Sequence, residues 1–377
     1  MTTVRVPTAA SAARTGVVAR PRGSRVPWLL VGLAVLVVSL LLALVVGPAS
    51  VAGPAPITPG DVLASGWHHV SAWLAERGLP VAVAENPLSR VRDAIIWEGR
   101  APRAVAAVLV GAGLALCGVV LQAATRNPLA DPYLLGISSG AALGAVAVLV
   151  LGVAVPLPVA AFAGAVLALL ATLGLAGIGG RLTATRAVLA GVAVGQAAAA
   201  GVSFVIFSTA QGDSYRDILG WLMGTFGAVS WSSVLIAAVA VVVLGGALLG
   251  FGRTLDAFSF GDVAATALGV HVVRTRWLLL VLSALLTGAL VSVSGAIGFV
   301  GLTVPHVVRL LLGPGRSGNA AVARTSAAVG GVFLLWADTV ARTAFAPLDV
   351  PVGVLTALLG APVFAILLMR SRRRGEA

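Results

Sequence analysis

The chain has 377 residues, of which 59% are hydrophobic and only 10% are charged. Soluble domains carry about 25% charged residues, so 13 acidic and 25 basic side chains cannot cover a soluble protein of this length. The apolar content excludes a disordered chain, and the single Cys117 excludes a disulfide scaffold. The composition predicts a membrane protein that crosses the bilayer many times.

A spanning helix needs about 20 mostly apolar residues. Two uncharged runs, 132–180 and 277–308, are too long for one helix each. Pro156 and Pro158 break the first run, and glycines within 295–301 predict a turn in the second. The ten predicted spans are 28–47, 104–125, 133–153, 159–179, 187–209, 230–252, 277–296, 299–313, 325–341 and 350–369.

The first apolar run could instead be a signal peptide followed by a cleavage site of small residues. We favour a retained span, because its apolar core is longer than usual for a signal peptide and because the orientation below needs an even number of spans.

Every basic residue is an arginine, and the arginines divide unequally between the two sides of this arrangement. Eighteen fall in the segments on one side and seven on the other, which places the first side in the cytoplasm. The predicted domains are an Arg-rich cytoplasmic tail (1–27), a ten-helix transmembrane domain (28–369) and a cytoplasmic C-terminal tail (370–377). The net charge of +12 is then mostly a topology signal and predicts no nucleic-acid partner.

Two loops are more than short connectors. The outer segment 48–103 contains an amphipathic stretch with two tryptophans, which predicts a helix lying at the membrane interface. Its adjacent His68 and His69 lack the companions of a metal site, so no metal is expected. The cytoplasmic segment 253–276 predicts two short helices, with Ser259 ahead of the second, Asp262 in its first turn and Gly269 at its end. The residues alone leave open whether this segment binds a partner protein or rests on the membrane.

Ionisable side chains are scarce inside the predicted spans. Asp338 lies four residues before Arg342, and the two could pair on a helix. The spans contain no pair of carboxylates for a proton relay, and the sequence has neither an HExxH nor a GxSxG motif. A membrane enzyme is therefore a poor fit, and an ion-coupled carrier is disfavoured.

A faint duplication relates 117–136 to 294–313, since both contain a proline-associated break and a Leu-Leu-Gly ending. It suggests two five-span halves of opposite orientation, an inverted repeat of the kind found in transporters.

Five motifs resemble the FecCD family, the permease subunits of ABC importers for iron-siderophores, haem and cobalamin. They are RAPR (100–103), RNPLADPYLLGISSGAALGA (126–145), GDVAATALGV (261–270), GAIGFVGLTVPHVVRL (295–310) and ADTVARTAFAPLDVPVGVLTALLGAPVFAILL (337–368). The resemblance covers about residues 60–370 in order and spacing. It departs at Ala101, where the family often has leucine.

The resemblance implies a multi-pass protein of the bacterial cytoplasmic membrane that pairs with a second permease copy or with a similar permease. It also implies two ATPase subunits that bind ATP and Mg²⁺, and an extracytoplasmic substrate-binding protein. The permease itself is expected to hold no cofactor and to catalyse no reaction. The expected cargo is a metal chelate, with an iron-siderophore ahead of haem and cobalamin.

The resemblance also assigns residues. Arg100, Arg103 and Arg342 would dock the binding protein through acidic groups. Segment 253–276 would couple to the ATPase through Gly261, Asp262, Ala265, Leu268, Gly269 and Val270. Asn127, Pro128, Asp131, Pro132, Gly136, Ser138 and Gly140 would form the signature loop along the translocation path, with the fifth and tenth spans as its walls. Thr183 and Thr185, which flank Ala184, would form an inner gate.

Overall fold

The computed structural model describes residues 26–46, 57–178, 184–209, 214–313 and 318–375. The described residues form helices and the connections between them, and they contain no β-strand. The N-terminal tail predicted for 1–27 lies almost wholly outside the described residues, as do 376 and 377.

Each predicted span contains a helix. The helices are α1 (Val26–Val45), α5 (Ala101–Thr125), α6 (Ile137–Leu149), α7 (Leu157–Gly177), α8 (Ala184–Thr209), the continuous α10–η3–α11 (Trp231–Gly250), α14 (Val272–Ser294), α15 (Val300–Leu312), α16 (Asn319–Thr343) and α17 (Val352–Gly375). Among the described residues, six helices are long and apolar enough to cross a membrane, and four others carry shorter apolar stretches.

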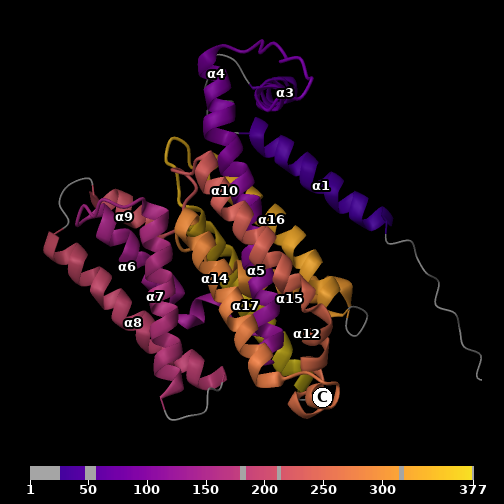
Figure 1. The fold of residues 1–377 in the computed structure, drawn as a ribbon, viewed down its shortest axis with the longest axis vertical. Coiled ribbons are helices and arrows are strands. Elements are labelled where there is room, and N and C mark those ends of the chain that lie inside the picture. Colours follow the sequence, from indigo (N-terminus) through magenta and orange to yellow (C-terminus); the bar gives the residue numbers. More distant parts are fainter. Residues whose placement is uncertain (1–25, 47–56, 179–183, 210–213, 314–317, 376–377) are drawn as a thin grey trace, which may run out of the picture.

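The helices form two groups (Figure 1). Helices α6, α7, α8 and α9 (Ser214–Leu222) lie together on one side, while α5, α10, α15 and α16 lie on the other. Helix α14 serves both groups, because its Leu279 and Leu286 belong to one buried apolar cluster and its Ala284 and Val291 to the other.

Helix α5 lies at the centre of the second group. In the most apolar 18-residue stretch of the continuous helix Arg90–Thr125, 78% is buried. Glycines bring its backbone against two neighbours: Gly111 meets Gly330 of α16, and Gly118 meets Gly301 of α15. A Cβ atom at Gly111 or at Gly118 would overlap the opposing carbonyl oxygen. Small residues are the usual means by which helices approach closely in lipid.

The predicted third span, 133–153, is wrong at both ends. A short 3₁₀ turn (Pro132–Leu135) and Gly136, whose φ is +73°, precede α6, which ends at Leu149. Asp131 caps the turn by accepting a hydrogen bond from the N–H of Tyr133. The aspartate and the left-handed glycine together begin the helix later than the apolar run suggests.

The predicted break between the seventh and eighth spans is present. Helix α14 ends at Ser294, and α15 begins at Val300 after Phe299, a non-glycine residue with a φ of +68°. Gly301 lies inside α15 and not in the turn.

The two breaks touch each other. The Tyr133 hydroxyl donates to the carbonyl of Ile297 at 2.9 Å and accepts from the N–H of the same residue at 3.1 Å. One side chain thereby satisfies both backbone groups of a residue that helices α14 and α15 leave unpaired.

The register predicted for the duplication is wrong. Segment 117–136 begins inside α5, whereas segment 294–313 begins where α14 ends. The order of elements is nevertheless repeated: a long helix, a break and a helix of 13 residues. Both short helices follow a residue of positive φ, so the structural counterpart of Gly136 is Phe299.

Short helices lie at both ends of the bundle (Figure 1). One end carries α3 (Pro59–Glu76) and α4 (Arg90–Ala94), which continues through the π-helical η1 (Ile95–Arg100) into α5. The other end carries α12 (Gly252–Ser259), α13 (Asp262–Ala267) and the last turns of α17. The first end is the one predicted to face outside.

Candidate functional site

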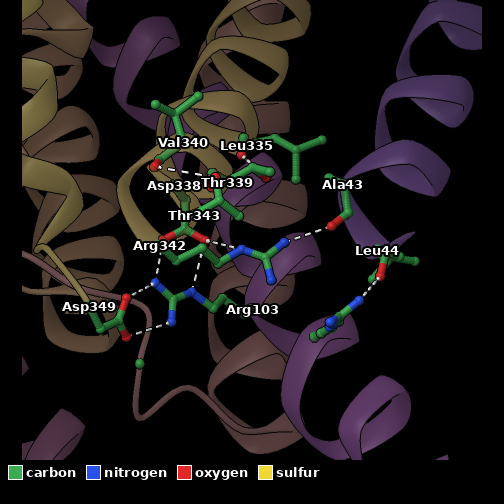
Figure 2. A network of polar contacts seen from close by, with 12 residues as sticks. Ala43, Leu44, Arg103, Leu335, Asp338, Thr339, Val340, Arg342, Thr343 and Asp349 are labelled. Carbon is green, nitrogen blue, oxygen red and sulfur yellow. Dashed lines mark hydrogen bonds and ion pairs between the residues drawn. The ribbon is translucent and has the colours of Figure 1, made fainter. Parts of the chain in front are cut away.

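The three arginines predicted to dock a binding protein lie near one another at the end of α1, with Arg342 beside Arg103 (Figure 2). Arg103 makes the most polar contacts of the three. Its guanidinium donates two hydrogen bonds to Asp338 of α16, at 2.8 and 2.9 Å. Two more go to Asp349, in the connection after α16, at 3.0 and 3.1 Å. Only 13% of the Arg103 side chain is exposed, so the guanidinium is enclosed by its two carboxylates.

The other two arginines hold the C-terminal end of α1. Arg100 donates to the carbonyls of Leu44 and Val45. Arg342 donates to the carbonyl of Ala43 (Figure 2). The last carbonyls of a helix have no partner within it and carry partial negative charge. The two guanidinium groups therefore cap α1, and Arg342 also lies 3.9 Å from Asp338, as its i,i+4 spacing predicted.

The three arginines of this cluster are mostly buried, whereas residues that dock a partner have to be accessible to it. Arg100 is 6% and Arg342 7% exposed, whereas Asp349 is the open member of the network, with 53% of its side chain exposed. Docking through these arginines remains a prediction. In this structure their guanidinium groups already have partners within the chain.

Helix α3 packs on α4 and the segment before it through polar contacts. His69 lies 2.9 Å from Asp93, Ser65 donates to the same carboxylate, and His68 bonds the carbonyl of Ala84. These contacts hold the Asp93 carboxylate, whose pKa lies below its ordinary value because hydrogen bonds from Ser65 and others outweigh the effect of burial. Across the described ranges, no three His, Cys, Asp or Glu side chains come together as a metal site.

The opposite face of α3 is apolar and open. Leu63, Trp67, Val70 and Trp73 are between 42% and 57% exposed and recur at helical spacing. This agrees with the amphipathic pattern that predicted an interfacial helix.

At the other end, segment 253–276 forms two short helices, but their boundary differs from the prediction. Ser259 ends α12 and donates back to Leu255, while Gly261, whose φ is +94°, stands before Asp262 at the start of α13. Gly269, with a φ of +83°, ends the turn after α13 as predicted, and the N–H of Val270 bonds the carbonyl of Ala265. Ser259 is a residue type that often caps a helix, but α13 follows Gly261, whose positive φ turns the backbone between the two helices.

Asp262 fixes this segment to the bundle. It accepts two hydrogen bonds from Arg276 of α14, at 2.8 and 3.2 Å, and lies 3.5 Å from Arg126. The Arg276 hydrogen bond is the main reason why the pKa of Asp262 lies below its ordinary value. Because the folded pKa is lowered, this contact stabilises the segment above the ordinary pKa of the aspartate and weakens as the pH falls through the lowered one.

Of the predicted coupling residues, Leu268 and Gly269 are exposed and the other four are buried or partly buried. Ala265 is fully buried, whereas Phe260, Val263 and Leu268 are 76%, 87% and 68% exposed. The predicted coupling residues did not include Phe260 and Val263, and coupling through this segment remains a prediction. The sequence could have indicated both residues. Exposed apolar side chains that no buried core requires are typical of a contact surface.

The signature residues form a packing junction. Asn127 caps the N–H of Leu129, and Gly136 lies against Gly191 and Gly195 of α8. Gly140 lets α6 approach Gly164 and Ala168 of α7. Pro132 is buried, Ser138 is partly buried, and Pro128 lines a pocket discussed below. Their role along a translocation path remains a prediction.

Of the predicted gate, Thr185 is exposed in the first turn of α8. Thr183 lies outside the described residues, so the gate also remains a prediction.

Comparison with known proteins identifies this arrangement. The model of the FecCD transport family matches residues 35–370, which is most of the chain. The chain belongs to the FecCD family. It is a multi-pass protein of the cytoplasmic membrane and an ABC importer permease of the metal-chelate and cobalamin group.

Similar proteins include two whose names state a cargo. The cobalamin import system permease BtuC of Halobacterium salinarum is 45% identical over 278 residues, 73% of each chain. The vitamin B12 import permease BtuC of Klebsiella pneumoniae is 38% identical over 292 residues, 76% of this chain and 86% of its own.

A solved structure has the same fold. It is described as an inward-facing conformation of a candidate metal-chelate type ABC transporter, and it matches with a TM-score of 0.73 and 30% identity. The match covers 91% of this chain and 99% of the other.

Proposed function

We propose that this chain is the membrane-spanning subunit through which an ABC importer moves cobalamin into the cell. The observation that supports this cargo is the 45% identity with a cobalamin permease over 73% of both chains. A ferric siderophore, the cargo expected from the family as a whole, is the competing assignment. The named relatives favour cobalamin over it.

We place ten crossings in two five-helix halves of opposite orientation, with both termini in the cytoplasm. The repeated order of long helix, break and 13-residue helix supports the halves. The last turns of α17 lie at the end of the bundle that carries α12, which is the cytoplasmic end in this arrangement (Figure 1).

Energy would come from two separate ATPase subunits. The sequence has no lysine and therefore no phosphate-binding lysine of a P-loop. Phe260, Val263 and Leu268 offer the apolar surface on which an ATPase would dock. A shallow groove of about 540 Å³ beside them, lined by residues from Thr266 to Arg274, extends that surface.

A second copy, or a similar permease, would complete the path. Helix α8 is the least buried of the six long apolar helices, since only 22% of its most apolar 18-residue stretch is buried. Its Phe204 and Phe207 side chains are 70% and 90% exposed. Helix α17 likewise exposes Leu358 and Leu359. Two copies that meet through these helices would cover both faces and enclose a path between them.

At the outer end, a carboxylate of the binding protein would compete with Asp349 for Arg103. Asp349 is the exposed partner, so it can be displaced without opening the buried pair between Arg103 and Asp338.

The test is uptake by liposomes that contain the permease with the ATPase and the binding protein of the same transport system. We expect ATP-dependent uptake of radiolabelled cyanocobalamin that does not occur without the ATPase. Uptake of a ferric siderophore or haem in its place would overturn the cargo. ATP-independent uptake would overturn the ABC mechanism.

A further inference from the structure

A pocket of about 330 Å³ that is lined mostly by polar residues opens at the end of the bundle that carries α12 and α13. Its polar lining consists of Gln122, Arg126, Ser259, Arg309 and Asn319. These residues come from the end of α5, from α12, from α15 and from the start of α16. Segments far apart in sequence therefore bring two guanidinium groups to one small space.

Arg309 is a partly buried cation with a neutral partner. Its Nη1 donates to Oε1 of Gln122, and the amide nitrogen of that glutamine is committed to the carbonyls of Gly301 and Leu302. Among the described residues, no carboxylate lies within ion-pair distance of Arg309. A partly buried charge without a counter-ion is costly, and a bound anion would compensate it.

Arg126 supplies the second charge from the left-handed cap of α5. Half of its side chain is exposed, and its carboxylate neighbour, Asp262, lies 3.5 Å away. Asp262 gives its two shorter contacts to Arg276 instead. The charge of Arg126 is thus only weakly compensated.

The remaining polar lining is made of neutral groups, and both nearby acids are already bonded. The side-chain amide of Asn319 donates one hydrogen bond to the hydroxyl of Ser259. The second hydrogen of that amide remains for another acceptor. Asp256 accepts the backbone N–H of Asn319 at 2.6 Å and, like Asp262, does not line the pocket.

We propose that this pocket binds a phosphate group. Arginine is the residue best suited to this ligand, because its planar fork matches two phosphate oxygens at once and keeps its charge. Two such forks with neutral donors beside them suit a polyatomic anion. Two sources of the same group reach this face of the membrane: the headgroup of an anionic phospholipid and soluble phosphate.

Two measurements on the purified full-length permease separate the sources. The first is equilibrium dialysis with radiolabelled orthophosphate in detergent at fixed ionic strength. The second is native mass spectrometry of protein released from nanodiscs of phosphatidylglycerol or of phosphatidylcholine. The test variants are Arg309→Gln and Arg126→Gln. The matched control is Arg324→Gln, because Arg324 is exposed on α16 near the same end and donates to the carbonyl of Ala320 outside the pocket.

We expect saturable binding that weakens at least tenfold in each test variant and is unchanged in the control. Orthophosphate binding assigns a soluble phosphate, and selective retention of phosphatidylglycerol alone assigns a headgroup. Absence of both in the unmodified protein would overturn the proposal, as would equal loss in the control. If Arg309→Gln does not elute as a folded protein, Arg126→Gln carries the test, since its side chain is half exposed.

Discussion

Arg103 makes four hydrogen bonds to carboxylates that lie 235 and 246 residues further along the chain. The two acids differ in their surroundings, since 3% of the Asp338 side chain is exposed and 53% of the Asp349 side chain. A buried carboxylate that loses its partner is far more costly than an exposed one. The pair with Asp338 is therefore the structural half of this contact, and the pair with Asp349 is the replaceable half.

This difference predicts unequal effects of two substitutions. Arg103→Gln leaves the Asp338 charge buried with only Arg342 at 3.9 Å, so we expect the free energy of unfolding to fall by about 3–5 kcal/mol. Asp349→Asn breaks an exposed pair and should cost less than about 1 kcal/mol. Thermal unfolding of the purified variants in detergent measures both. Equal losses of stability would show that the two carboxylates are equivalent.

The sequence predicted which arginines lie at this end of the molecule, but it did not predict their burial or their hydrogen-bond partners. Their positions follow from motifs that are local in the chain. Their burial depends on Asp349 and on the end of α1, which are remote in sequence and which no periodic pattern connects to Arg100 or Arg342. The pairing of Asp338 with Arg342 was predictable from helical spacing, but the stronger pairing with Arg103 was not.

At the scale of helices, the crossing of α5 and α16 depends on two glycines whose backbones touch. A side chain at Gly111 would overlap the backbone carbonyl of Gly330. We expect Gly111→Val to force the helices apart and to lower the free energy of unfolding by about 1–3 kcal/mol.

The matched control for this crossing is Gly246→Val, because no atom lies within 4 Å of a Cβ at that position. Denaturant titration in mixed micelles compares the two variants with the parent. A loss of stability as large in Gly246→Val would attribute the effect to helix propensity and not to the crossing.

The apolar face of α3 makes a second prediction at this scale. If Trp67 and Trp73 lie in the outer headgroup region, lipids brominated near the headgroup should quench their fluorescence in nanodiscs. We expect Trp67→Phe and Trp73→Phe each to reduce the quenchable fraction. Trp97→Phe is the control, because Trp97 is stacked against His69 at a centroid distance of 4.3 Å. Quenching that is unchanged in both α3 variants would place this face in water or against a protein.

Helices were predictable where the apolar run alone decides them. Each predicted span contains a helix, because lipid leaves an apolar stretch no other way to pair its backbone. The start of α6 at Ile137 was missed, because Gly136, a left-handed residue, decides it. The predicted start of the eighth span, 299, agrees with the start of α15 at Val300, but the left-handed conformation of Phe299 was not predicted. For Phe299, no local pattern predicts positive φ. The conformation is held by tertiary contacts, including its side chain against Gly360 of α17.

At the scale of the whole molecule, the proposed contact between segment 253–276 and an ATPase should depend on the exposed apolar side chains of that segment. Phe260→Asp combined with Val263→Asp places two charges on that face and should abolish co-purification with the ATPase while the permease remains folded. Val91→Asp is the control, because Val91 is 71% exposed on α4 at the opposite end. An ATPase that still co-purifies with the double variant would exclude this face as the contact.

The 13-residue length of α6 and α15 also bears on how the protein is made. Each rises only about 20 Å, while the hydrocarbon core of a bilayer is about 30 Å thick. Neither is long enough to cross that core by itself, so each depends on neighbouring helices for its position. For α6 these are α7 and α8, which follow it in the chain. For α15 one such neighbour is α5, which Gly301 touches at Gly118 and which the ribosome completes long before α15 emerges. The order of synthesis thus makes α5 the surface on which α15 is inserted.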